Sequence, residues 1–243
     1  MLSPSFGNYF ASQVYHTCQP TTRPHVSLSY ASWVPRLFPS DKAYANYWKS
    51  RETCLRKLLK RHSITVESTK NDTVMHFRCG DVPFSSHRIY RMPSINYLKF
   101  VVKHMKIRHV IRANIYWTLS HANDMTRYSG CVSMLEDIKK YFLSRGVYIT
   151  IIDEKNAMKT LNIFGNANIL VSLVPSSFAF SVGVVKGSNF ISPFLGLSGI
   201  EGENTLNIVN KTRAKLMVKS LHWVMSTDES LAPGQLFKFN SLN

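Results

Sequence analysis

The spacing of apolar residues alternates between two periods along the chain. Between 41 and 62, Leu55, Leu58 and Leu59 fall on one helical face and the basic residues fall elsewhere, which predicts an amphipathic helix that begins after Ser40. From residue 73 onward, short β-branched or aromatic runs alternate with further segments of helical period. These patterns predict strands at 73–78, 111–119, 147–152, 169–173 and 189–191, and helices at 94–106, 132–142, 154–162, 178–186 and 211–225. Residues 1–40 read as irregular, with one short helix near 10–15.

This order of elements predicts the fold class. Strands that alternate with helices form a largely parallel sheet covered by helices. The run Ile169–Leu173 is almost continuously apolar, as in a strand buried on both faces. We therefore expect an α/β protein with a Rossmann-like parallel sheet. Ligands of such sheets bind beyond the carboxyl ends of the strands.

Composition narrows the classes of partner. The chain has 243 residues, 44% of them hydrophobic, which argues against a disordered protein. Its net charge of +16 predicts attraction to an anion: nucleic acid, acidic lipid, acidic glycan or a phosphorylated small molecule. The four cysteines contain no C-x-x-C pair, which argues against a zinc ribbon, and in a chain of this length they do not indicate a disulfide framework.

No membrane-spanning segment is expected. Met1-Leu2-Ser3-Pro4 is not followed by an apolar stretch of the kind found in a signal peptide. The most apolar long window, Ile169–Val185, is interrupted by Pro175 and several serines.

Polar residues lie at the ends of three of the predicted strands. They form the segments His76-Phe77-Arg78-Cys79-Gly80-Asp81, Ser120-His121-Ala122-Asn123-Asp124 and Pro175-Ser176-Ser177-Phe178. Because a parallel sheet brings its carboxyl ends to one edge, these segments can converge. A serine turn that enters a helix offers hydroxyls, backbone N–H groups and the positive end of the helix dipole to an anion. Arg78 adds a planar guanidinium that grips a phosphate bidentately.

Simpler interpretations exist for each of these residues. Ser177 could be only an N-cap, the commoner role of such a serine. Arg78 could form a structural ion pair with Asp81 or Asp124. His76 could be a core histidine whose hydrogen bonds are satisfied.

The same segments resemble motifs of a known family. His76-x-Arg78-x-Gly80-Asp81 is similar to the H-x-R-x-x-D motif of the α1,2-, α1,6- and protein O-fucosyltransferases, and 169–180 is similar to their apolar strand, Ser-Ser-Phe turn and helix. The resemblance covers roughly 40–195. It implies a GT-B fold of two Rossmann-like lobes and GDP-fucose as the donor. Since few residues precede the first motif, 1–70 would be a reduced N-terminal, acceptor-side region, or the acceptor half would be absent from this chain. Residues 71–243 would form the lobe that binds the nucleotide sugar.

The resemblance also implies site residues. Arg78, Ser176, Ser177 and Phe178 would hold the donor diphosphate, and His76 with Asn123 or Asp124 would lie near the nucleotide. The chain departs from the family at Cys79, where many members carry a second arginine, and at Ala122-Asn123, where α1,2-type members carry Ser-Asp.

The resemblance implies an inverting transfer of fucose to a glycan, with no cofactor besides the nucleotide-sugar donor. Arg78 and the helix start at 176–178 could stabilise the leaving diphosphate without a metal, and no clustered acidic pair with magnesium-binding spacing is evident, so we expect metal independence. Asp81 and His87 are the candidate bases, with Asp124 behind them. Two alternatives stay open: a basic nucleic-acid-binding protein, which we do not expect, and a transferase-like fold that binds without turnover. The sequence does not choose between the cytoplasm and a Golgi-like compartment.

Overall fold

The computed structural model describes residue 18 and residues 41–66, 72–79, 95–118, 125–174, 176–186, 189–195 and 221–226. The short helix expected near 10–15 lies outside these residues. The elements are α2 (Asp41–Arg61), β1 (Thr73–Arg78), α3 (Ile95–Ile107), β2 (Arg112–Thr118), α4 (Met125–Leu143), β3 (Tyr148–Asp153), α5 (Ala157–Asn166), β4 (Ile169–Ser172), α6 (Ser177–Lys186), β5 (Phe190–Leu195) and β6 (Leu221–Ser226).

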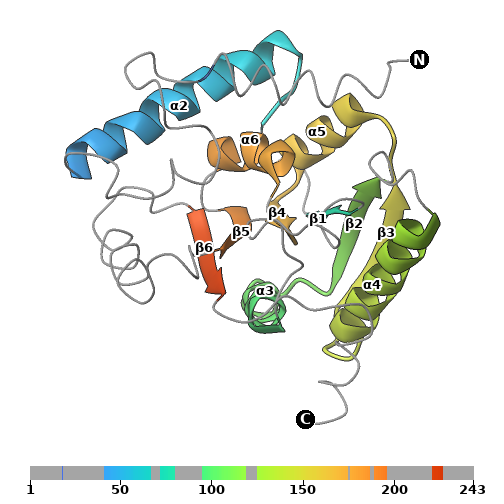
Figure 1. Cartoon of the computed structure of the whole chain (residues 1–243). Helices are drawn as coiled ribbons and strands as arrows, with labels where there is room; N and C mark the ends of the chain where they lie inside the picture. Colours follow the sequence, from blue (N-terminus) through green and yellow to red (C-terminus); the bar gives the residue numbers. More distant parts are fainter. Residues whose placement is uncertain are drawn as a thin grey trace.

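All six strands form one parallel sheet in the order β3-β2-β1-β4-β5-β6. Helices α3 and α4 lie on one face of this sheet, and α2, α5 and α6 lie on the other (Figure 1). From β1 the chain adds β2 and then β3 toward one edge of the sheet. Helix α5 then leads back to β4, which pairs with the other side of β1, and β5 and β6 follow toward the opposite edge. This arrangement confirms the predicted α/β class with a Rossmann-like parallel sheet.

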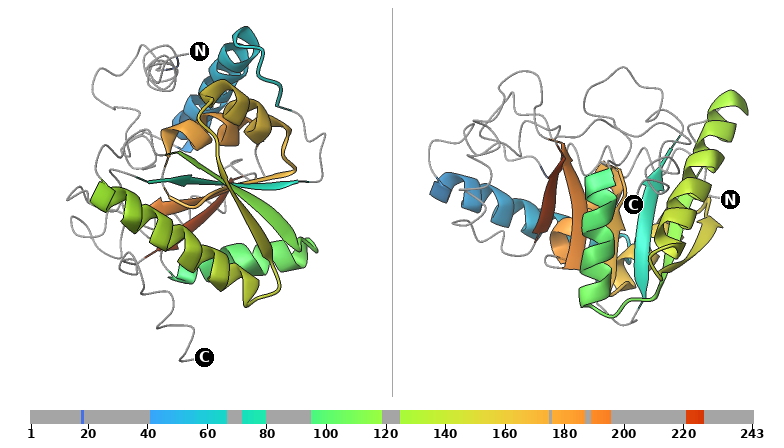
Figure 2. Two further views of the ribbon diagram at one scale, coloured as in Figure 1. Left: turned by 90° about the vertical axis from the view of Figure 1, so that its right-hand side faces the viewer. Right: turned by 90° about the horizontal axis from the view of Figure 1, so that it is seen from below.

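Each face of the sheet has its own apolar core. Met75 and Phe77 of β1 belong to the core under α3 and α4, whereas Val74 belongs to the core under α2, α5 and α6. This alternation follows from the two-residue period of a strand. Because both faces are covered, β4 is fully buried, as its apolar sequence predicts. Figure 2 shows the helical layers on the two sides of the twisted sheet.

Helices α2, α3 and α4 end in the same kind of turn. Each has a residue of positive φ just after it: Ser63 (56°), His109 (55°) and Gly146 (80°). The residue that follows donates its N–H to a carbonyl five positions earlier, as Val147 does to Phe142 at 3.0 Å. Gly146 thus ends α4.

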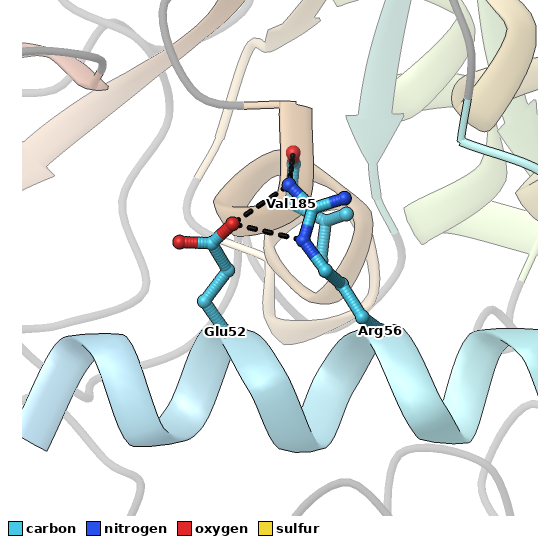
Figure 3. Close-up of polar contacts among 3 residues, drawn as sticks. All are labelled: Glu52, Arg56 and Val185. Atoms are coloured by element: carbon cyan, nitrogen blue, oxygen red, sulfur yellow. Dashed lines mark hydrogen bonds and ion pairs between the residues drawn. The ribbon is translucent and has the colours of Figure 1, made fainter.

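Helix α2 is bound to the end of α6. The guanidinium of Arg56 donates to the Val185 carbonyl at 3.1 Å and forms an ion pair with Glu52 at 2.7 Å (Figure 3). Leu55, Leu58 and Leu59 enter the core under α5 and α6. Although α2 lies within the predicted region 1–70, it packs directly on α5 and α6, which belong to the predicted region 71–243.

Two expectations from the sequence are wrong. Residues 221–226 form strand β6, not the end of a helix, and β6 pairs with β5 from Phe190↔Leu221 to Leu195↔Ser226. The apolar run Leu221-His222-Trp223-Val224 fits either structure by period alone, and pairing with a neighbouring strand decides it. The disulfide expectation is also wrong, because Cys18 bonds Cys54 and Cys79 bonds Cys131. None of the helices among the described residues has the length and apolarity needed to cross a bilayer.

Candidate anion site at the switch point of the sheet

The ends of β1 and β4 lie side by side at the point where the winding direction changes. His76 pairs with Ser172, and the Leu173 N–H donates to the His76 carbonyl at 2.8 Å. Beyond this point β1 leads toward α3 on one face, and β4 leads into α6 on the other (Figure 1). Ligands of doubly wound sheets bind at such a switch point, beyond the carboxyl ends of the strands. Two of the three polar segments therefore meet there.

Helix α6 begins at this edge with Ser176 as its N-cap. The Ser176 hydroxyl accepts from the Ala179 N–H at 3.5 Å, so this serine, and not Ser177, fills the capping role. Intrahelical bonds cannot use the N–H groups of Ser177 and Phe178 in the first turn. The 10-residue helix adds its positive end to these donors. The arrangement favours an anion placed before α6.

Buried hydrogen bonds fix the segment that leads into α6. The Tyr97 hydroxyl of α3 donates to the Ser172 carbonyl at 2.5 Å, and the Ser172 hydroxyl donates to the Val174 carbonyl at 2.5 Å. Burial raises the pKa of Tyr97 well above its ordinary value, so it remains a neutral donor. The sequence does not single out Tyr97, because its position on the apolar face of α3 is typical of a core residue.

His76 contributes a neutral imidazole on the α6 side of the sheet. Its ring lies 5.4 Å from that of Phe164 and 5.8 Å from that of Phe178, measured between centroids. Burial, assisted by the positive charge of Arg78, lowers the pKa of His76 to about 3. Within the described part of the chain its buried Nδ1 has no hydrogen-bond partner. Among the described residues, therefore, nothing satisfies this nitrogen as a core histidine would be satisfied.

Arg78 is the last residue of β1 and is half-buried. It is two residues from His76 and so lies on the same side of the sheet, where its charge acts on the imidazole. Cys79 points to the opposite side, where it bonds Cys131 of α4. At the position where many fucosyltransferases of the resembled family carry a second arginine, this chain therefore has a covalent link to α4.

The other predicted site residues are outside the described chain. Asp81, His87, Asn123, Asp124 and the side chain of Ser177 belong to this group. The structure therefore leaves their roles, and the ion pairs of Arg78 with Asp81 or Asp124, as predictions. In the parts of the chain that the structure describes, no cluster of three histidine, cysteine or acidic side chains could hold a metal ion.

An open groove of about 500 Å³ lies apart from these residues. Its lining comes from β2, α4 and β3: Trp117, Val132, Leu135, Glu136, Lys139, Ile149, Thr150 and Ile151. None of the switch-point residues lines it.

The chain was compared with known families, proteins and structures. No family model and no curated protein matches it. Two crystal structures of POFUT1 in complex with GDP show a distant likeness, each with a TM-score of 0.32. The first is 14% identical over 61% of this chain and 49% of POFUT1, and the second is 11% identical over 77% and 56%. The chain thus spans about half the length of POFUT1, and a likeness this distant carries no argument about function.

Proposed function

We propose that the chain is a glycosyltransferase that transfers L-fucose from GDP-fucose to a glycan acceptor. The observation that carries the proposal is the meeting of an H-x-R strand end with the start of α6 at the switch point of the sheet. A nucleoside diphosphate is the ligand class that suits this combination of a guanidinium and a helix N-terminus. The H-x-R segment and the Ser-Ser-Phe turn supply the likeness to fucosyltransferases.

In this proposal the site stabilises the leaving group. As the bond from the sugar C1 to the β-phosphate oxygen breaks, negative charge grows on the diphosphate. Arg78 and the first N–H groups of α6 hold that charge, which is the large contribution to such a reaction. His76 remains uncharged beside Phe178 and offers hydrogen bonding without a titrating charge near neutral pH.

The acceptor hydroxyl attacks C1 from the face opposite the diphosphate, so the anomeric configuration inverts. Its proton passes to a base, for which Asp81 and His87 are the candidates, with Asp124 behind them. Asn123 or Asp124 would contact the nucleotide. The reaction needs no metal in this scheme, since Arg78 and α6 supply the positive charge. The region 1–70 would serve the acceptor side of a reduced GT-B arrangement.

The test is a thermal-shift comparison in the presence of a chelator. GDP and GDP-fucose should raise the melting temperature of the wild-type protein, and UDP and UDP-glucose should not, since selective ligands stabilise the folded state by mass action. Arg78→Ala should weaken GDP binding at least about tenfold, since a charge-assisted bond contributes roughly 1.5–3 kcal/mol.

Arg112→Ala is the matched control, because it removes a guanidinium at an exposed position at the opposite end of the sheet. It should bind GDP as wild type does. Equal GDP binding by Arg78→Ala and wild type would refute the role of Arg78. Binding of duplex DNA but of no nucleotide would refute the proposed function and favour a nucleic-acid-binding protein. GDP binding without transfer to any acceptor would favour the binding-only alternative.

A further inference from the structure

The open groove beside α4 lies along one edge of the sheet. Strand β3 is the outermost strand on that side, and among the described strands it pairs with β2 alone. Helix α4 lies beside it on the face of the sheet that α3 also covers (Figure 1). The groove has a volume of about 500 Å³, and its lining is mostly apolar: Trp117, Val132, Leu135, Ile149 and Ile151, with Glu136, Lys139 and Thr150.

The backbone of β3 has one side that faces away from β2. The N–H groups of Tyr148 and Glu154 donate to carbonyls of the neighbouring β2 segment at 2.9 and 3.2 Å. Since alternate residues of a strand bond to opposite neighbours, Ile149, Ile151 and Asp153 direct their N–H and C=O groups outward. No strand among the described residues pairs with that side. An unpaired row of this kind is a template for another strand.

The side chains of β3 make this edge apolar on the α4 side. Ile149 is buried in the core under α3 and α4, and Ile151 packs against the same core. Because residues paired across two strands place their side chains on the same face, a strand that pairs with Ile149 and Ile151 directs alternate side chains into the groove. Features that commonly block such pairing are missing from β3, which contains neither proline nor lysine and has a continuous register with β2.

The charge around the groove is balanced. From Val132 to Asp153 the chain has three acidic and three basic residues, although its whole net charge is +16. At the rim of the groove, Glu136 and Lys139 of α4 lie 3.9 Å apart, and their side chains are 45% and 43% exposed. A second copy of the chain that approaches this edge therefore meets no local excess of like charge.

We propose that two copies of the chain associate through their β3 strands, which pair antiparallel about a twofold axis. Such a contact needs a surface that is complementary to itself. The outward N–H and C=O groups of β3 pair with their antiparallel copies, and isoleucines of both copies fill the joined groove. Across the axis, Glu136 of one copy meets Lys139 of the other. An extended peptide would use the same backbone groups without this reciprocal match of charges.

This association leaves the candidate anion site uncovered. The twofold axis joins the two sheets edge to edge and points the carboxyl ends of their strands in opposite directions. The switch-point residues at the ends of β1 and β4 thus lie at opposite ends of the dimer, and none of them belongs to the contact. Association and anion binding can therefore be tested independently.

The experiment is sedimentation velocity over a range of protein concentrations. Wild-type protein should form a dimer by about 100 µM, a concentration that populates even a dimer of micromolar Kd. Ile151→Pro should remain monomeric, because it removes an outward N–H and a groove side chain but none of the hydrogen bonds to β2. Lys139→Glu should weaken association roughly tenfold, because attraction in two symmetric ion pairs becomes repulsion.

Two further variants separate this contact from general effects of charge. Glu136→Lys/Lys139→Glu should restore association, because each copy again presents both signs at the rim. Lys103→Glu makes the same change in net charge as Lys139→Glu, at an exposed position of α3 outside the groove, and should not weaken association. Circular dichroism reports whether each variant is folded, and the charge variants decide the question if Ile151→Pro does not fold.

Wild-type protein that stays monomeric at about 100 µM would overturn the proposal. Binding of that monomer to a synthetic peptide of alternating valine and threonine would assign the edge to an extended peptide instead. Equal association by Ile151→Pro and wild type would show that the copies meet elsewhere, and would also overturn it. So would a charge-swapped Glu136→Lys/Lys139→Glu protein that associates no better than Lys139→Glu.

Discussion

At the scale of single residues, His76 connects the core with the candidate site. It pairs with Ser172 in the sheet, packs against two phenylalanine rings and lies within the influence of Arg78. A charged imidazole in this place would lose hydration and meet a like charge. The residue is therefore held neutral over the whole range in which an ordinary histidine titrates.

This neutral state makes the protein sensitive to acid. Between its ordinary pKa of 6.5 and the folded value of about 3, the unfolded chain binds a proton at His76 that the folded chain does not. Stability must then fall as the pH falls through this range, by roughly 4 kcal/mol at its lower end. His76→Asn should remove this part of the dependence of the free energy of unfolding on pH. Urea unfolding between pH 7 and 4 measures it for both proteins.

The quantity to compare is the slope of the free energy of unfolding against pH, since His76→Asn also loses packing at every pH. His109→Asn, an exposed change with the same chemistry, should keep the wild-type slope. If His76→Asn and wild type lose stability in parallel as the pH falls, His76 is not the group that is kept neutral.

At the scale of elements, α6 is held at both ends. Its beginning follows the hydrogen-bonded segment that Tyr97 anchors, and its last turn accepts a hydrogen bond from Arg56. Lys186 at its end donates to the carbonyls of Gly165, in the last turn of α5, and of Ala167, the C-cap of α5. Such contacts orient the helix start that faces the candidate site. Precise placement of that start is what preorganised binding of a diphosphate needs.

Gly165 of α5 lies against the backbone of the segment that follows α2, at Thr65 and Val66. A methyl group on Gly165 would lie 2.0 Å from the Thr65 carbonyl oxygen, which is backbone and cannot rotate away. Gly165→Ala should therefore destabilise the protein by at least about 1–3 kcal/mol, despite the better helix propensity of alanine. Denaturant unfolding at neutral pH measures the change.

Gly146→Ala provides the reference for this prediction. That site has open space around a Cβ and only a left-handed backbone, so the cost there should be about 1 kcal/mol. Gly165→Ala should cost more than Gly146→Ala. A gain in stability from Gly165→Ala would show that α5 moves aside freely.

The sequence predicts elements well where period and length agree. The apolar run of β4, the amphipathic α2 and the glycine after α4 each have a local physical cause. The strand at 221–226 does not, because a short apolar run becomes a strand through its pairing with β5. The candidate site likewise contains residues that a local sequence signal identifies and residues that none identifies. His76 and Arg78 were found by their motif, whereas Tyr97 acts through a carbonyl 75 positions away that the sequence does not place beside it.

At the scale of the whole molecule, two disulfides join segments far apart in the chain. The Cys18–Cys54 bond joins two residues 36 positions apart and attaches Cys18 to α2. The Cys79–Cys131 bond joins two residues 52 positions apart and links the end of β1 to α4. Spacing could not predict these pairs, since neither is local. With Cα–Cα distances of 5.5 and 5.9 Å, both pairs fit the ordinary range. Pairing of all four cysteines is typical of proteins that fold in an oxidising environment.

The two disulfides should contribute similarly to stability but differently to the candidate site. Loops of these lengths predict a loss of about 4 kcal/mol for each pair when it is removed. Cys79 directly follows Arg78, so Cys79→Ala/Cys131→Ala also frees the strand end that holds the guanidinium. We expect this variant to bind GDP more weakly than Cys18→Ala/Cys54→Ala, although both unfold at lower urea concentration. Titration with GDP well below each melting temperature separates affinity from stability, and equal affinity in the two variants would show that the bond to α4 does not position Arg78.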